Sequence, residues 1–117
     1  MLSDKNYDLE ERTFRFAKDC RKYVKSLNAS IGNLEDGKQL IRSSGSVGAN
    51  YIEANEKLGE KDFQFRLRIA RKEAKESGYW LRLLKEMNPK NEQVEGLIKE
   101  SFELRKILSS ILNKVKC

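Results

Sequence analysis

The sequence predicts an all-α fold: one up-down-up-down antiparallel four-helix bundle domain covering residues 1–117. Apolar residues recur at steps of three and four along most of the chain, which is the period of amphipathic helices, and no segment alternates as a strand does. The chain also has a single proline and 36% charged residues, a composition typical of a bundle with solvated outer faces. We expect helices at about residues 8–27, 34–58, 61–87 and 91–116.

The first helix has a core-facing stripe whose steps alternate between four and three residues, at Leu9, Thr13, Phe16, Cys20, Tyr23 and Leu27. The segment NASIGN then breaks the pattern. Asn33 is expected to be the N-cap of the second helix, because Glu35 and Asp36 follow where carboxylates suit the helix dipole. Gly59 suits the position after that helix, where a left-handed backbone is needed.

The second helix contains an unusual stretch, RSSGSVGANYIEAN, at residues 42–55. The core-facing stripe continues through it at seven-residue intervals, at Leu40, Val47 and Ala54. Gly45 and Gly48 each cost about 1 kcal/mol relative to alanine inside a helix. We therefore expect a neighbouring helix to pack closely here, because small residues permit a close approach that offsets their poor propensity.

Two polar residues, Ser43 and Asn50, fall on the core-facing side of the same stretch. A buried amide without hydrogen bonds costs about 1–3 kcal/mol. We therefore expect Asn50 to be largely buried and hydrogen-bonded, with Glu53, Glu76 or a serine of the stretch as its partner. This predicts a polar network inside a tightly packed helix rather than a ligand-binding loop.

The third helix has the clearest core-facing stripe, which consists of Phe63, Leu67, Ala70, Ala74, Ser77, Leu81 and Leu84. It ends near Asn88, because a residue before proline is kept out of helical geometry. Asn91 is expected to cap the fourth helix. The core-facing stripe of that helix is formed by Val94, Leu97, Ser101, Leu104, Leu108, Ile111 and Val115.

Several apolar residues of the last two helices lie away from the core-facing stripes, and we treat them as oligomer-interface candidates: Phe65, Ile69, Tyr79, Leu83 and Phe102. A wide core face is one explanation, since a bundle helix can bury three of every seven positions. Exposed aromatic residues on one face are also typical of a protein interface. On this evidence we expect a homo-oligomer.

The net charge of +6 favours an acidic partner such as RNA, although a mixed-charge surface with surplus lysine is an equally open interpretation. The segment from Arg105 to Cys117 carries four positive and no negative side chains. Phosphate contacts need only cations at suitable spacing, and Tyr79 or Phe65 could stack on a base. The nucleic-acid-binding candidates are Arg12, Arg15, Lys18, Lys22, Lys25, Arg66, Arg68, Arg71, Lys72, Lys75, Arg82 and Lys85.

The composition argues against an enzyme and against a bound cofactor or metal. The chain has no histidine, which excludes histidine-based catalytic arrangements and the Glu-x-x-His pairs of di-iron bundles. A magnesium site built from Glu53, Glu73 and Glu76 is conceivable; the alternative is that they pair with cations, as Lys72 could with Glu76. Two cysteines make no disulfide framework, and without a signal peptide or membrane span we expect a cytoplasmic protein.

The segment GKQLIRSSGSVGANYIEANE followed by KDFQFRLRIARKEAKESGYWLRLL resembles the four-helix-bundle family of 23S ribosomal RNA intervening-sequence proteins, and the resemblance runs from Tyr7 almost to the C-terminus. Its most specific elements are found in three groups along the chain. They are Arg42, Ser43, Ser46, Gly48, Ala49, Asn50 and Glu53, then Asp62 and Phe63, then Glu73, Glu76, Tyr79, Trp80 and Leu81.

The resemblance implies a small bacterial bundle that assembles into a ring, with a homopentamer expected. The family name describes a gene location within ribosomal RNA genes and implies no activity. The family is also similar to the accessory protein of diversity-generating retroelements, a basic pentameric barrel that binds nucleic acid and a reverse transcriptase. Two functions follow as expectations: a non-enzymatic oligomer that binds structured RNA or another nucleic acid, or an adaptor for a protein such as a reverse transcriptase.

Overall fold

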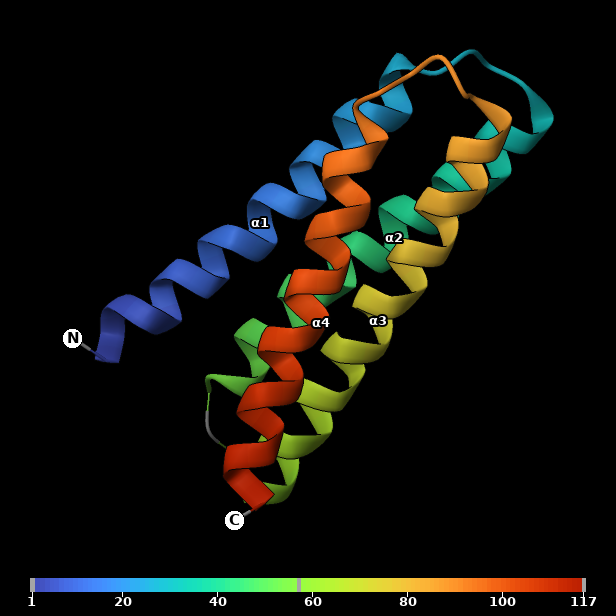
Figure 1. Cartoon of the computed structure of the whole chain (residues 1–117). Helices are drawn as coiled ribbons and strands as arrows, with labels where there is room; N and C mark the ends of the chain where they lie inside the picture. Colours follow the sequence, from blue (N-terminus) through green and yellow to red (C-terminus); the bar gives the residue numbers. More distant parts are fainter. Residues whose placement is uncertain (1, 57, 117) are drawn as a thin grey trace.

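Four α-helices follow one another in the computed structural model, which describes residues 2–56 and 58–116, with side chains from residue 8 to residue 114 apart from residue 57. They are α1 (Leu2–Ser26), α2 (Ile31–Ala54), α3 (Glu60–Met87) and α4 (Val94–Lys116). Consecutive helices run antiparallel and pack side by side, and α1 also contacts α4 (Figure 1). The predicted all-α four-helix bundle is therefore confirmed.

The start of α2 differs from the sequence prediction. Ser30 is the N-cap, with extended backbone angles, and its Oγ accepts a hydrogen bond from the Asn33 backbone N–H at 3.1 Å. The prediction of an Asn33 cap is thus wrong, because a serine three residues earlier already satisfies this free N–H group. As a result, Glu35 and Asp36 lie beyond the first turn of the helix.

The end of α2 also comes earlier than the predicted residue 58. The helix ends at Ala54, and the side-chain amide of Asn55 donates to Glu10 Oε2 at 2.9 Å, which ties this end to α1. Gly59 has the positive φ that we expected, at +146°, but it is the residue that precedes α3 rather than the one that closes α2. A side chain at this backbone conformation would be strained.

The start of α4 is later than predicted, at Val94 rather than near residue 91. The Asn91 side chain does accept a backbone hydrogen bond, from Gln93 N–H at 3.1 Å. This bond closes a turn that precedes the helix instead of capping its first turn. At the other end of the chain, α1 extends to Leu2, six residues before the expected start near residue 8.

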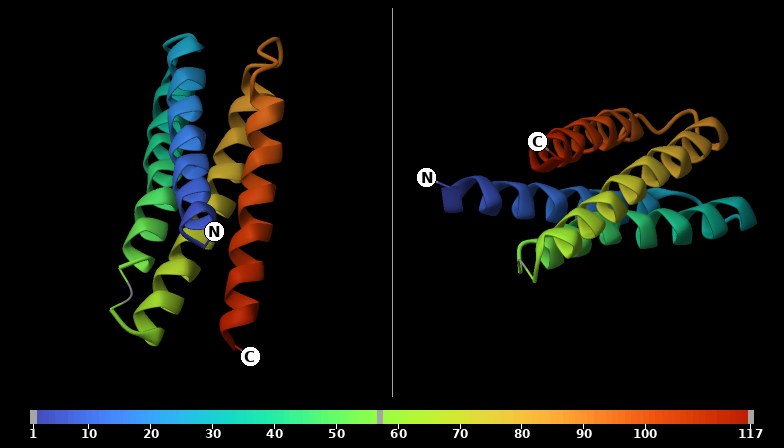
Figure 2. Two further views of the ribbon diagram at one scale, coloured as in Figure 1. Left: turned by 90° about the vertical axis from the view of Figure 1, so that its left-hand side faces the viewer. Right: turned by 90° about the horizontal axis from the view of Figure 1, so that it is seen from below.

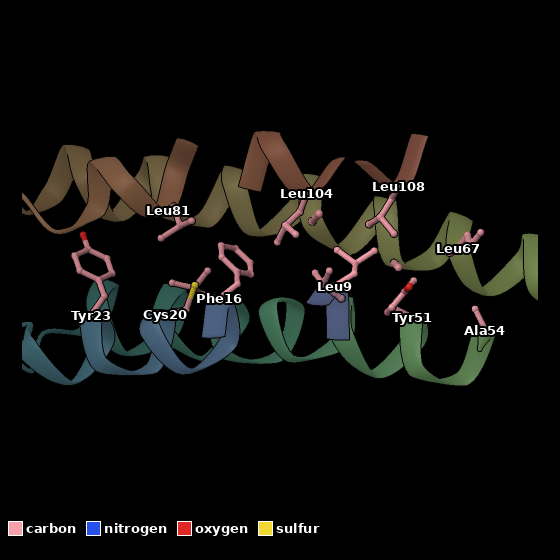
Figure 3. Close-up of a cluster of buried hydrophobic side chains, with 14 of the residues drawn as sticks. Leu9, Phe16, Cys20, Tyr23, Tyr51, Ala54, Leu67, Leu81, Leu104 and Leu108 are labelled. Carbon is pink, nitrogen blue, oxygen red and sulfur yellow. The ribbon is translucent and has the colours of Figure 1, made fainter. Parts of the chain in front are cut away.

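The predicted core-facing stripes form the core. Figure 3 shows Phe16, Cys20 and Tyr23 of α1 pointing toward side chains of α3 and α4, Leu81 and Leu104 among them. All five of these side chains are buried. The stripe residues that are only partly buried lie near helix ends: Leu27, Phe63, Leu97 and Ile111. Val115 lies outside the described side chains.

Close packing at the glycines of α2 explains the unusual stretch. A Cβ atom built on Gly48 would lie 2.8 Å from Thr13 Oγ1 of α1, and one built on Gly37 would lie 2.8 Å from Val24 Cγ1. Both distances are shorter than ordinary van der Waals contact, so α1 packs directly on the backbone of α2. At Gly45 the added atom would meet only the flexible end of Arg21, at 3.1 Å.

The polar residues inside the bundle partly correct the prediction for Asn50. Its side-chain amide donates to the Ser46 carbonyl at 2.9 Å, as a serine of the stretch was expected to accept, but Asn50 is partly rather than largely buried. The buried polar contact between α2 and α3 is instead a 2.9 Å hydrogen bond from Ser77 Oγ to Ser43 Oγ. Small serines fit this tight interface, whereas the longer Asn50 side chain bends back to its own helix.

A second polar contact joins the start of α2 to the end of α3. Asn33 Nδ2 donates to Asn88 Oδ1 at 3.0 Å, and Asn88 Nδ2 donates back to Asn33 Oδ1 at 2.8 Å. At the opposite end of the bundle the N-terminal part of α1 diverges from α4 (Figures 1 and 2).

Candidate nucleic-acid interface

The cations predicted on α1 share their surface with carboxylates. Arg12 makes a two-bond ion pair with Glu100 of α4, with N–O distances of 2.7 and 2.8 Å. The Glu100 hydrogen bond raises the pKa of Arg12, which therefore stays charged and paired. Arg15 lies 3.4 Å from Glu11. Lys18, Lys22 and Lys25 remain as exposed cations of this helix.

The cations predicted on α3 fall into two groups. The first group pairs with neighbouring carboxylates: Arg66 with Asp62 at 3.7 Å, Lys72 with Glu76 at 3.9 Å, and Lys85 with Glu95 at 2.7 Å. The second group has no ion pair with any described residue and consists of Arg68, Arg71, Lys75 and Arg82. The Lys72–Glu76 pair confirms the contact that their spacing predicted.

Three of the unpaired cations, Arg68, Lys75 and Arg82, form a line along α3. They are exposed and seven residues apart, which places them on one face of the helix. With a rise of 1.5 Å per residue, successive members are separated by about 10.5 Å along the axis. The line is therefore an extended row of positive charge, about 21 Å long.

Helix α4 adds a further cation to this row. A Cβ atom on Gly78 would lie 2.9 Å from Ser101 Oγ, and Arg71 Nη1 donates to Ser109 Oγ at 3.4 Å. These contacts set the antiparallel register of α3 and α4, which brings residue 105 level with residue 75. We call the resulting surface the α3–α4 basic face; it consists of Arg68, Arg71, Lys75, Arg82 and Arg105.

Arg105 was missing from the predicted binding residues. The charge imbalance of the segment from residue 105 to the C-terminus was the signal that could have identified it. Its guanidinium lies over the ring of Phe102, with Cζ 5.7 Å from the ring centroid, an attractive cation–π geometry. It pairs with no carboxylate among the described residues.

A groove with a mixed apolar and charged lining borders the α3–α4 basic face. It has a volume of about 480 Å³, and its apolar lining comes from Tyr79 and Leu83 of α3 and from Ile98 and Phe102 of α4. Its charged lining is formed by Arg82, Lys85, Glu86 and Glu95. Three oligomer-interface candidates thus come together here, and two of them are strongly exposed: Tyr79 at 55% and Phe102 at 46%. The other two candidates, Phe65 and Ile69, lie nearer the start of α3 and do not line this groove.

The carboxylates considered for a magnesium site do not line this groove. Glu73 lies on the α2 side, where burial raises its pKa, the charge of Glu76 adds to this rise, and the charges of Lys72 and Arg42 oppose it. No three acidic, cysteine or histidine side chains of the described residues group together as a metal site would require. The conceivable magnesium site at Glu53, Glu73 and Glu76 is therefore not assembled.

The remaining residues of the resemblance lie along α2 and the adjoining part of α3. Ser43 and Gly48 are buried and serve packing, whereas Arg42 and Glu53 are exposed and Ser46, Asn50 and Trp80 are partly buried. None of these α2 residues lines the groove on the α3–α4 side.

In the described part of the chain, no helix is long and apolar enough to cross a membrane.

Comparisons with known proteins agree with this architecture. The sequence model of the 23S rRNA-intervening sequence protein family matches residues 5–110. The crystal structure of a protein with unknown function from the S23 ribosomal protein family of Bacteroides thetaiotaomicron VPI-5482 is similar, with a TM-score of 0.82 and 32% identity. This similarity covers 93% of the present chain and 98% of that chain. No curated protein matches the chain.

Proposed function

This chain belongs to the 23S rRNA-intervening sequence protein family, and we propose that it is a nucleic-acid-binding protein that contacts phosphates through the α3–α4 basic face. The observation that carries the proposal is that five cations lie on this face without a carboxylate partner among the described residues. Unneutralised cations in a row attract a polyanion. RNA is the expected ligand, and the cytoplasm is where we expect it to be bound.

We propose in addition that the protein acts as a homo-oligomer, with a ring of five subunits expected from the resemblance. The exposure of Phe65 and the partial exposure of Ile69 support a contact between copies on the part of α3 outside the groove. An oligomer would present several basic faces to one RNA and so strengthen binding by avidity. Light scattering at micromolar concentration tests this, and a monomer mass would contradict it.

The binding experiment compares two triple variants with equal loss of charge. One replaces Arg68, Lys75 and Arg82 by glutamine, and the other replaces the exposed α1 lysines, Lys18, Lys22 and Lys25. Fluorescence anisotropy with a labelled fragment of 23S ribosomal RNA gives the dissociation constant at several salt concentrations. Each lost phosphate contact should reduce the salt slope of log K by about 0.7–0.9, so the α3 variant should lose about 2–3 in slope.

The α1 variant is the matched control and should change the slope much less. Equal effects of the two variants would mean that net charge alone attracts RNA, and the proposed face would then be wrong. Absence of binding by the unaltered protein at low salt would reject the function itself.

A protein-interaction adaptor is the second candidate, supported by the exposed apolar side chains on α3 and α4. A pull-down from the native cell distinguishes the two functions. Recovery of RNA without a stable protein partner would exclude the adaptor, whereas a stoichiometric protein partner such as a reverse transcriptase would favour it.

A further inference from the structure

We infer that the α3–α4 basic face binds unpaired nucleotides in preference to duplex, with a base stacked on Phe102 beside Arg105. The inference rests on the proposed function and specifies the class of its ligand. Its first basis is the position of the aromatic residues. Phe102 is 46% exposed and Tyr79 is 55% exposed, and both lie next to the row of cations rather than on a separate surface.

Exposed aromatic rings among cations suit single strands better than duplexes. Bases in a duplex are stacked inside the helix, and the major groove of double-stranded RNA is too narrow for side chains to read. Proteins that hold single strands combine a positively charged track with aromatic rings on which bases stack. The α3–α4 basic face supplies the cations and the bordering Tyr79 and Phe102 supply the rings, whereas duplex binding would need only the cations.

Phe102 lies between two hollows of different character. On one side is the groove of about 480 Å³ that it shares with Tyr79 and Ile98, and that Glu86 and Glu95 also line. On the other side is a shallow hollow of about 710 Å³, which Phe102 lines together with Arg105 and Lys106. A nucleotide at this position could place its base against the ring and its phosphate against Arg105, since Lys106 is paired with Glu103 at 3.5 Å.

The geometry of Arg105 supports that placement. Its guanidinium carbon lies 5.7 Å from the centroid of the Phe102 ring, so a positive charge is held next to the aromatic surface. From Arg105 the strand can continue along α3, because the register of the two helices places Lys75 at the same level. Arg68 and Arg82 then lie one seven-residue step to either side, about 10.5 Å away along the helix axis.

A second copy of this chain is a less suitable occupant of the groove. In a ring, neighbouring subunits meet through two different surfaces, and a copy seated on this groove would also cover Arg82, Lys75 and Arg105, which have no carboxylate partner among the described residues. Burying cations without partners opposes association. A polyanion with flat apolar bases matches both the charge of this face and the exposed rings.

The test measures two probes and three substitutions by fluorescence anisotropy at low salt. The probes are a labelled oligouridine of about 12 nucleotides, within the usual site size for single strands, and a blunt-ended RNA duplex with the same number of phosphates, which has no unpaired loop. The unaltered protein should bind the oligouridine at least about 5-fold more tightly, because stacking on one aromatic ring contributes at least that factor.

Phe102→Leu should weaken oligouridine binding by about 5- to 150-fold and leave the salt slope unchanged, because it removes a stack and no phosphate contact. Phe14→Leu is the matched control: Phe14 is an exposed phenylalanine of α1 outside this face, and its replacement should have no effect. Lys75→Gln should weaken both probes and reduce the salt slope by about 0.7–0.9.

The outcomes separate this inference from the function on which it rests. If Lys75→Gln weakens binding but Phe102→Leu does not, or if the duplex binds as tightly as the oligouridine, the basic face remains and the stacking site is wrong. If neither substitution changes binding, the proposed face itself fails. Light scattering tests a further outcome, in which the unaltered protein is an oligomer and Phe102→Leu dissociates it. In that case the groove is a contact between copies and the inference is overturned.

Discussion

Replacing Gly48 with alanine adds one methyl group where α1 lies closest to α2. The new Cβ atom would be 2.8 Å from Thr13 Oγ1 and 3.1 Å from Thr13 Cβ. Thr13 is fully buried and its hydroxyl donates to the Glu10 carbonyl at 2.9 Å. Because a β-branched side chain has few rotamers in a helix, Thr13 cannot simply turn away, and the two helices would have to move apart.

Two effects of opposite sign decide the magnitude. Alanine favours the helix over glycine by about 0.8–1.0 kcal/mol. Forcing an extra methyl group into a packed core costs about 1–3 kcal/mol. We therefore expect Gly48→Ala to lower the free energy of unfolding by about 1 kcal/mol. Gly96→Ala is the control, because a Cβ atom on Gly96 would meet nothing within 4 Å, and it should instead stabilise by up to about 1 kcal/mol.

Urea unfolding followed by far-ultraviolet circular dichroism, at one protein concentration, measures both changes. A double-mutant cycle with Thr13→Ala makes the test specific, since this substitution removes the atom at 2.8 Å and leaves the contact at 3.1 Å. The coupling between the two sites should then be about 1 kcal/mol. Equal stabilisation by Gly48→Ala and Gly96→Ala would refute the close approach of α1 and α2 at this point.

Three further predictions use the same unfolding assay. The buried Tyr23 hydroxyl has no hydrogen-bond partner among the described residues, so Tyr23→Phe should stabilise by about 1 kcal/mol, and a loss of stability would show that the hydroxyl is satisfied. Asn88→Ala leaves the buried Asn33 amide without its reciprocal partner and should cost about 1–3 kcal/mol; an unchanged midpoint would contradict this. Burial raises the pKa of the Cys20 thiol from 9.0 to about 12, so above pH 9 the unfolded state loses this proton first. Stability should then fall by up to about 1.4 kcal/mol per pH unit, and Cys20→Ala should remove that part of the slope.

The periodic part of the fold could be predicted because burial follows helical geometry. The stripe residues of α1 and α3, such as Phe16 and Leu67, are buried as their spacing requires. The helix ends could not be predicted as well, because several polar residues compete for the same free backbone groups. Ser30 caps α2 in place of Asn33, whose side chain bonds instead with Asn88, a residue 55 positions away.

The candidate site depends more strongly on tertiary structure. Sequence spacing alone places Arg68, Lys75 and Arg82 on one side of α3, but the ion pairs that neutralise Lys85 and Arg12 involve a different helix. Spacing within one helix could not show which cations remain unpaired. For the same reason the sequence did not identify Arg105 as a binding residue, because its position beside α3 follows from the register between two helices.

That register also explains why the basic face is formed by α3 and α4. Gly78 and Ser101 are small enough to bring the two backbones together, and Arg71 bonds to Ser109 across the same contact. Larger residues at Gly78 would separate the helices, and Arg105 would then move away from the row on α3. On α1, the cation that faces α4 is Arg12, and its charge is neutralised by the ion pair with Glu100. The small residues that look unfavourable for a helix are therefore what allows charges of two helices to act as one surface.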